Sequence, residues 1–120
     1  MKVSEFIGEL FLSRNLAHSV HLYTRSYAKH KALDLFYNNV IELTDNFAET
    51  YQGKYGLIGN IPIIGAPKTS KIVEFLENQL EMFEKDRYSI CPKEYTPLQN
   101  IIDEIISLYL STIYKLKCFS

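Results

Sequence analysis

Apolar side chains recur every three or four residues in four stretches of the chain, which is the spacing of one face of an α-helix. The stretches are residues 3–24, 27–52, 70–86 and a last one that begins at Thr96. The first has apolar residues on two strips and so needs two packing partners, whereas each of the others has one apolar face. With no strand pattern between them, the stretches predict an all-α four-helix bundle that forms one domain over residues 1–120.

Local signals indicate where two of these helices begin or end. Ser26 is the expected N-cap of the second helix, because its hydroxyl can accept a backbone N–H, and Gly53 and Gly56 are expected to end that helix. At the start of the fourth helix, Thr96 is the expected N-cap, followed by a proline, with Gln99 reaching back to complete a capping box.

The connection between the second and third helices, "YGLIGNIPIIGAPKTS", is rich in glycine and proline and yet apolar. Its helix-free part, about fifteen residues, is long enough to cross the bundle rather than turn back as a tight hairpin. An apolar segment such as residues 57–66 usually packs against its own domain or against a neighbouring molecule. The sequence leaves both arrangements open.

The second helix has a polar face opposite its apolar one, on which His30, Asp34, Asp45 and Glu49 fall within about 100° of one another. Asp34 and Asp45 are roughly 16 Å apart along the axis, too far for one metal ion to bind both. The four residues are, however, symmetric in sequence: His30 and Glu49, and likewise Asp34 and Asp45, are equidistant from a point between residues 39 and 40. Two copies packed antiparallel about a two-fold axis there would bring His30 and Asp34 of one chain to Asp45 and Glu49 of the other.

His18 on the first helix is the expected fifth member of this set. If the first two helices form a hairpin that turns near residue 26, His18 lies level with residue 35 and close to Asp34. His21, one turn further on, is a weaker candidate that could support a ligand. Two imidazoles and three carboxylates suit Fe(II), Zn(II) or Mn(II). Because carboxylates stabilise Fe(III), the expected chemistry is iron oxidation by peroxide or dioxygen.

The spacing of His18, His30, Asp34, Asp45 and Glu49 resembles the ferroxidase ligand pattern of the Dps-type mini-ferritins, and "TDNFAE" is similar to that family's Asp-x-x-Ala-Glu stretch. The resemblance implies a shortened, divergent member of the family, with a ferritin-like four-helix bundle and a crossover between the second and third helices. It also implies a catalytic iron site to which one chain gives both histidines and the first aspartate. The second aspartate and the glutamate would come from its mate.

Three departures from that family narrow what the resemblance implies. Ser19 follows the first histidine where the family usually has tryptophan, no Lys-rich arm is present, and the apolar connection replaces a short interface helix. DNA binding is therefore not expected. A two-fold homodimer is expected in preference to the family's hollow shell.

Composition narrows the range of partners. Thirteen Lys and Arg against fourteen Asp and Glu give a net charge of -1, which predicts no surface for nucleic acid or anionic lipid. No apolar run approaches the roughly 20 residues of a membrane span, and charged residues interrupt the first twenty positions, so no secretory leader is expected. Cys91 and Cys118 lack a CxxC spacing, which favours free thiols in the cytoplasm.

Two functions stay open from the sequence. A lone histidine or carboxylate on a helix is usually a packing or solvated group, but five ligand-type residues on one face favour an iron-binding ferroxidase with a site shared between two-fold related subunits. Zinc or manganese could take the place of iron. The alternative is a non-enzymatic oligomeric helical interaction module that binds partners through residues 57–66 and has no redox activity.

Overall fold

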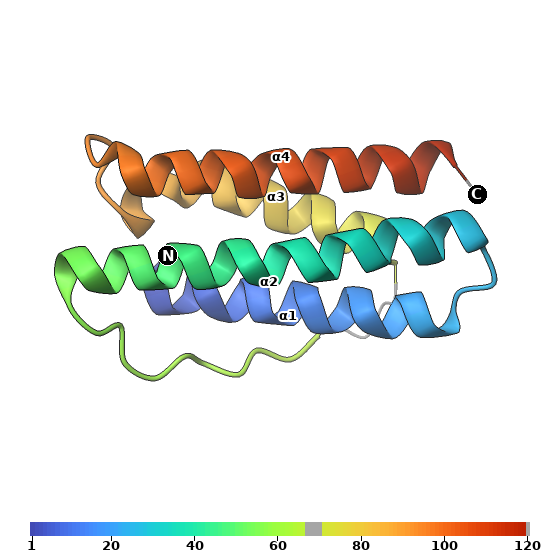
Figure 1. Ribbon diagram of the computed structural model, residues 1–120, viewed down its shortest axis with the longest axis horizontal. Coiled ribbons are helices and arrows are strands. Elements are labelled where there is room, and N and C mark those ends of the chain that lie inside the picture. The colour runs from blue at the N-terminus through green and yellow to red at the C-terminus, as the bar shows by residue number, and fades with distance from the viewer. Residues whose placement is uncertain (67–70, 120) are drawn as a thin grey trace.

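Four helices, and no strand, make up the part of the chain that the computed structural model describes, residues 1–66 and 71–119 (Figure 1). The helices are α1 (Val3–Tyr23), α2 (Tyr27–Tyr55), α3 (Ile72–Ile90) and α4 (Thr96–Cys118). The predicted all-α bundle is confirmed. α2 and α3 continue three and four residues beyond their predicted ends, and the predicted start of α3 at residue 70 lies outside the described residues.

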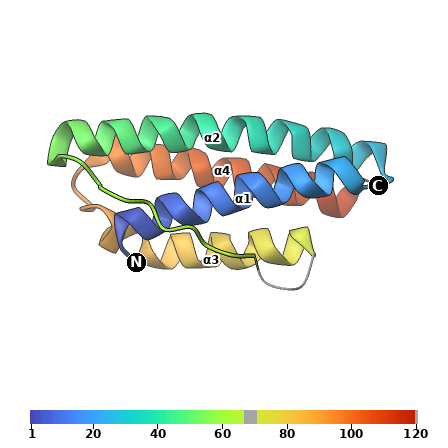
Figure 2. The ribbon, with the colours of Figure 1, turned by 90° about the horizontal axis from the view of Figure 1, so that it is seen from below.

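The four helices form a ring in which each packs against two neighbours. α1 contacts α2 and α3, and α4 contacts the same two helices from the other side. α1 and α4 run in one direction while α2 and α3 run in the other (Figures 1 and 2). Consequently α2 and α4 lie antiparallel and form one long outer face of the bundle.

Aromatic rings from all four helices fill the centre of the bundle. Phe6 packs edge-on against Phe47 and Phe83, with centroid distances of 5.1 and 4.9 Å. Tyr109 packs edge-on against Phe36 and Phe83. All five rings are fully buried, and because aromatic side chains bury the largest apolar areas, this cluster contributes strongly to stability.

A buried polar chain passes through the same region. The Tyr109 hydroxyl donates to Oε1 of Gln79 at 2.7 Å, and Nε2 of Gln79 donates to the backbone carbonyl and the carboxylate of Glu9, both at 2.9 Å. Burial raises the pKa of the Tyr109 phenol, so the hydroxyl keeps its proton and remains a donor. These directional bonds fix the heights of α4, α3 and α1 relative to one another.

The ends of α2 agree in part with the sequence signals. Ser26 is the N-cap, and its Oγ accepts the Lys29 N–H at 3.2 Å, as predicted. Gly53 lies inside the helix and does not end it. Gly56 does, with a φ of 98° that suits glycine better than any other residue.

The predicted capping box at the start of α4 is wrong. The N-cap is Tyr95, and Thr96 is already the first helical residue. Gln99 turns toward α3 instead of its own helix end. Its Nε2 donates to the Cys91 carbonyl at 3.0 Å, and its Oε1 accepts from Nε of Arg87 at 2.8 Å. This side chain therefore joins the end of α3 to the start of α4.

Two predictions from composition can be compared with the described residues. None of the described helices is long and apolar enough to cross a membrane. Cys91 and Cys118 are free thiols, the first buried and the second exposed. Burial raises the pKa of the Cys91 thiol, which makes it a poor nucleophile.

Residues 56–66 run as an extended strap over α1 (Figure 2). Ile58 and Ile61 pack against the core, so the strap lies on its own domain, which is one of the two arrangements that the sequence allowed. Leu57 and Ile63, in contrast, are 88% and 102% exposed. The strap therefore adds apolar side chains to both the interior and the surface.

Gly8 is the point on α1 where the strap comes closest. A Cβ at Gly8 would lie 2.8 Å from the carbonyl oxygen of Pro62 and 3.1 Å from Cδ1 of Ile64. Cβ atoms do not tolerate backbone oxygens at the shorter distance, so any side chain here has to push the strap outward. Glycine at this position is what lets the strap lie flat on the helix.

We predict that Gly8→Ala lowers the free energy of unfolding by ~1–2 kcal/mol through overpacking and makes the strap easier to cleave with protease. Gly53→Ala is the matched control, because this helical glycine has no described atom within 4 Å of an added Cβ. It should raise stability by ~0.5–1 kcal/mol. Urea denaturation and limited proteolysis measure both. Equal stabilisation by the two substitutions would contradict the close approach.

Candidate functional site

All three histidines of the chain gather where α1 meets α2. His21 and His30 stack with their ring centroids 3.7 Å apart and their planes 17° from parallel. Nδ1 of His21 lies 2.6 Å from the His30 carbonyl oxygen, and Nδ1 of His30 lies 2.8 Å from the His21 carbonyl oxygen. A ring stack and two reciprocal hydrogen bonds thus join the end of α1 to the start of α2.

The reciprocal bonds fix the tautomer of both rings. A carbonyl oxygen only accepts hydrogen bonds, so Nδ1 of His21 and of His30 must each carry a proton. The free nitrogen is then Nε2 on both rings. Because the rings are nearly parallel and 3.7 Å apart, their Nε2 lone pairs lie in separate planes and cannot converge on one ion at the ~2.0–2.1 Å that a metal–imidazole bond needs. The pair is built as a clamp between helices.

His18 continues the cluster on the other side. Its ring stacks on Tyr37 at 4.2 Å, and the Arg14 guanidinium lies 5.3 Å from the centre of the same tyrosine ring. The Tyr37 hydroxyl donates to Oδ1 of Asp34 at 3.0 Å. Burial and, after it, the hydrogen bond to Asp34 raise the pKa of the Tyr37 phenol, so this proton is retained. The structure therefore brings His18 and Asp34 together through Tyr37.

Asp45 and Glu49 are not part of this cluster. Both lie exposed on later turns of α2, and Asp34 and Asp45 are roughly 16 Å apart along the helix. Within the described residues of a single chain, no group of three or more His, Cys, Asp or Glu side chains could hold a metal ion. A metal site built from the predicted set thus needs a second copy of the chain.

His21 has a larger role than the sequence predicts. The sequence predicts a residue that supports a ligand, whereas His21 is the partner of His30 and the most buried of the three histidines, at 8% exposure. One signal could have identified the pair: His21 and His30 are equidistant from the turn at residues 25–26, and so face each other in a helical hairpin.

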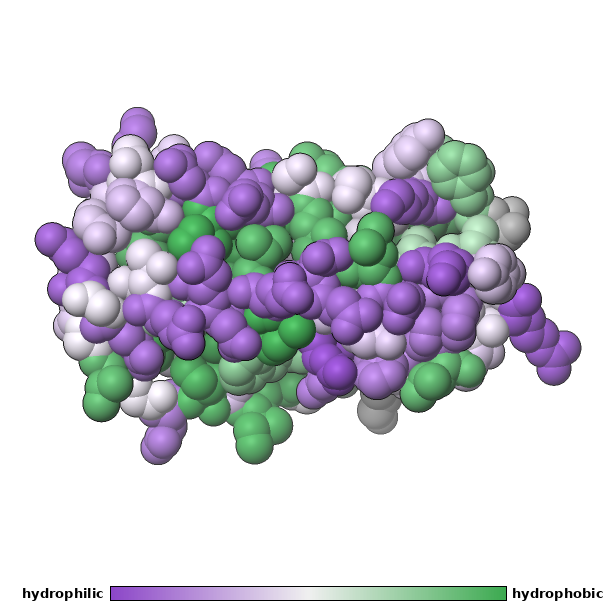
Figure 3. Space-filling view, viewed as in Figure 1, coloured by the Kyte–Doolittle hydropathy of each residue, from purple (hydrophilic) through white to green (hydrophobic). Residues whose placement is uncertain are grey.

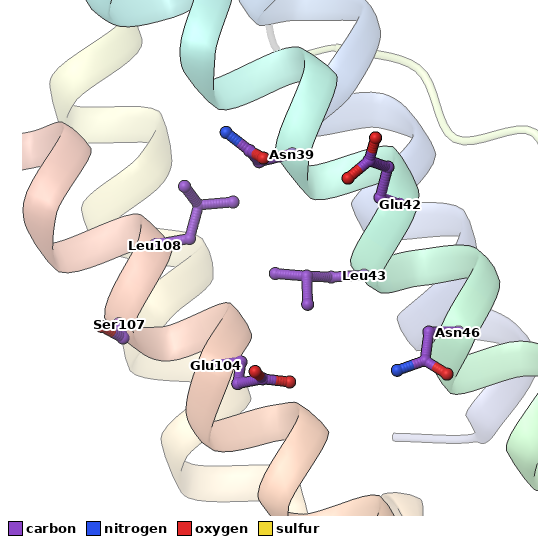
Figure 4. Close-up of a pocket in the computed structure, with 7 residues that line it drawn as sticks. All are labelled: Asn39, Glu42, Leu43, Asn46, Glu104, Ser107 and Leu108. Carbon is purple, nitrogen blue, oxygen red and sulfur yellow. The ribbon is translucent and has the colours of Figure 1, made fainter.

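A second surface feature lies between α2 and α4, where an open groove has a volume of about 560 Å³. Figure 4 shows its side chains, with Leu43 extending from α2 toward α4. The lining residues are Asn39, Glu42, Leu43, Asn46, Glu104, Ser107 and Leu108. The groove therefore has leucines between polar and acidic side chains from both helices.

Charge on this face is segregated along its length. Lys31 and Lys115 lie at the end where α2 begins and α4 finishes, with one carboxylate, Asp34, beside them. Glu42 and Glu104 line the groove nearer the middle, and Glu49 follows on α2. The two lysines and three glutamates form no ion pair within the described part of the chain. In Figure 3 a band of hydrophilic side chains runs lengthwise across this face, with hydrophobic side chains beside it.

Comparison with known proteins shows the family. Residues 21–116 match the model of a family of unknown function, DUF5856, and the chain belongs to that family. A similar protein is the uncharacterized 14.6 kDa protein of the mobD–ri intergenic region of Enterobacteria phage T4. It is 31% identical over 118 residues, which are 96% of this chain and 88% of the phage protein. No solved structure matches the chain.

These matches overturn the identification of the chain as a shortened Dps-type mini-ferritin. The family that matches most of the chain is a different one, and the phage relative is not described as a ferritin. The spacing from His18 to Glu49 was a likeness confined to two helices. One of its members, His30, is engaged in the clamp with His21.

We predict that His21→Ala and His30→Ala each lower the free energy of unfolding by ~1–3 kcal/mol, because each removes the ring stack and one reciprocal hydrogen bond. Since the stack is lost only once, the double variant should cost less than the sum by at least ~0.5 kcal/mol. Ser19→Ala, at an exposed position of the same helix, is the control. Chemical denaturation of the four variants measures this, and purely additive losses would contradict the clamp.

Proposed function

We propose that this member of the DUF5856 family is a self-associating helical module that pairs with a second copy through its α2–α4 face. The observation that supports this is the segregation of charge along the face, with Lys31 and Lys115 at one end and Glu104 and Glu49 toward the other. A second copy placed parallel would set like charges opposite each other. Placed antiparallel, it would set each lysine near a glutamate.

The height of the proposed two-fold axis follows from the same residues. Lys31 and Glu49 are symmetric about residue 40, close to the centre that the sequence predicted. Val40 itself is fully buried in the core, so the axis would pass beside Asn39, at the edge of the groove. Antiparallel copies would then place the groove of one chain against the groove of the other.

Apolar side chains would supply most of the affinity, because charge complementarity mainly sets orientation and the rate of encounter. Leu43 and Leu108 lie in the groove, and Leu35 is 49% exposed on the same face. The bundle measures 44 × 25 × 22 Å. One long side is therefore large enough for the ~800 Å² per partner that is typical of a stable interface.

The connection between α2 and α3 belongs to the same proposed architecture. α2 and α3 run in the same direction (Figure 1), so the chain between them has to return along the bundle. This supports a crossover connection, as in the topology of ferritin-like bundles.

Charge reversal tests the pairing. We predict that Lys31→Glu together with Lys115→Glu weakens self-association at least tenfold, because both lysines then repel the glutamates of the second copy. Adding Glu49→Lys and Glu104→Lys in the same chain should restore it, since the complementarity is then inverted as a whole. Sedimentation equilibrium over a range of protein concentrations gives the dissociation constants.

Lys85→Glu is the control for the change in net charge, because Lys85 is exposed on α3, away from the α2–α4 face. It should leave the dissociation constant within about twofold. Raising the salt concentration should weaken the wild-type pair through screening. A wild-type chain that stays monomeric at every concentration would overturn the proposed function.

A metal site shared between two copies is a second candidate, supported by one observation. Asp45 and Glu49 are exposed on the outer ridge of α2. A different antiparallel pairing, in which α2 of each copy meets the other along this ridge instead of through the α2–α4 face, would bring them toward His30, Asp34 and His18 of the other copy. These two imidazoles and three carboxylates are suitable ligands for iron, and equally for zinc or manganese. Nε2 of His30 is available for such a bond, since only its Nδ1 is used in the clamp.

For this second candidate we predict that anaerobic Fe(II) titration of the wild type saturates at a fixed ratio of iron to chain, and that added peroxide or dioxygen oxidises the bound iron. A His30→Ala, Glu49→Ala double variant should lose both the stoichiometric binding and the fast oxidation. Sedimentation of the same variant shows whether it still pairs. Equal iron binding and oxidation by wild type and variant would exclude the shared site and leave self-association standing.

A further inference from the structure

A second hollow lies on the α2–α4 face, at the end where α2 begins and α4 finishes. Its volume is about 520 Å³, within the ~300–1,000 Å³ of small-molecule sites. The lining residues are Ala28, Lys31, Ala32, Asp34, Leu35, Lys115 and Phe119. Two alanines on successive turns of α2 leave this space open, because a larger side chain at either position would fill it.

The apolar part of the lining is partly exposed to solvent. Leu35 and Phe119 are 49% and 50% exposed, although both are large hydrophobic side chains. The Phe119 ring meets the ring of Tyr114 edge-on, with the centroids 5.7 Å apart. A ligand with an apolar body would therefore cover hydrophobic surface that water covers in the free protein.

The charged groups around the hollow favour an anion. Lys31 and Lys115 form no ion pair within the described residues, whereas the neighbouring Lys117 is paired with Glu77 at 2.8 Å and points its charge to α3. An anion is attracted more strongly by two lysines that have no ion-pair partner than by lysines that a carboxylate already neutralises.

Asp34 is the one acidic group in the lining, and one of its carboxylate oxygens already accepts two hydrogen bonds. Its Oδ1 accepts from the Tyr37 hydroxyl at 3.0 Å and from Nδ2 of Asn38 at 3.3 Å. Both donors belong to α2, so these bonds hold the carboxylate on its own helix, and it keeps its negative charge. Two lysines and one aspartate leave the lining with a net positive charge.

We propose that this hollow binds a small amphipathic anion, with an aromatic or branched apolar body and one carboxylate. The body lies between Leu35 and Phe119, over the alanines, and the carboxylate lies between Lys31 and Lys115. The proposal does not rest on self-association. Because a second copy would use the same lysines, the anion and the second copy compete, and occupancy of the hollow lowers the affinity of pairing.

Titration with 2-naphthoate, followed by the backbone amide signals of ¹⁵N-labelled protein, tests the proposal. At a protein concentration where sedimentation shows monomer, the ligand should shift amides at residues 28–35 and 115–119 in a saturable way. The neutral 2-naphthamide has the same body and should bind at least tenfold more weakly. Lys115→Gln should weaken 2-naphthoate at least fivefold, and Ala28→Leu should abolish its binding by filling the hollow.

Lys117→Gln is the matched control, because this lysine is paired with α3 and lies outside the lining. It should leave the affinity for 2-naphthoate unchanged, and the amide spectra show whether each variant is folded. The proposal is overturned if naphthoate and naphthamide bind alike, if Lys115→Gln and Lys117→Gln have the same effect, or if no shift saturates. The self-association test changes Lys31 and Lys115 as well, but sedimentation measures it without ligand and its rescue uses Glu49 and Glu104, which lie outside the hollow, so either idea can fail alone.

Discussion

The reciprocal pairing of His21 and His30 is the constraint on which the relation between α1 and α2 depends. The two rings can stack, and each Nδ1 can reach the other carbonyl, only when the last turn of α1 lies level with the first turn of α2. That register brings Phe6 of α1 to Phe47 of α2 and leaves the outer ridge of α2 facing solvent. The two histidines therefore have a structural role, in which each Nδ1 is used. Any chemistry at this corner has to use Nε2 of these rings.

The opposite side of α2 gives the molecule its candidate interaction surface. There the core is complete beneath α2 and α4, yet leucines and unpaired charges stay accessible along the groove between them. Lysines at one end and glutamates toward the other make the surface directional. The same lysines frame the apolar hollow beside Phe119, so pairing with a second copy and binding of a small anion would draw on one set of contacts.

The parts of the fold that the sequence predicted were those encoded locally. Helical spacing of apolar residues gave all four helices, and a single hydroxyl at Ser26 gave the start of α2. The cap at Thr96 was misjudged because Gln99 had a better partner at the end of α3 than at its own helix end. This contact forms only when α3 and α4 have packed together, so the local sequence around Thr96 cannot reveal it.

The candidate site was predictable in the same uneven way. Its residues were identified on α2, but their spacing resembled a metal-ligand pattern more than it resembled a hairpin clamp, which hid the role of His21. A net charge of -1 gave no hint that Lys31 and Lys115, far apart in the chain, would share one end of a face. Segregation of charge is a property of the packed helices and cannot be read from composition.

Distances between spin labels show whether two copies pair antiparallel through the α2–α4 face. Labels on Asn46→Cys and on Lys54→Cys, each in a Cys118→Ser background, report the separation of the same residue in two copies. Antiparallel pairing about residue 40 predicts separations along the axis of about 18 Å at position 46 and about 42 Å at position 54, from 1.5 Å per residue. Equal separations at the two positions, or no coupling between labels, would contradict antiparallel pairing.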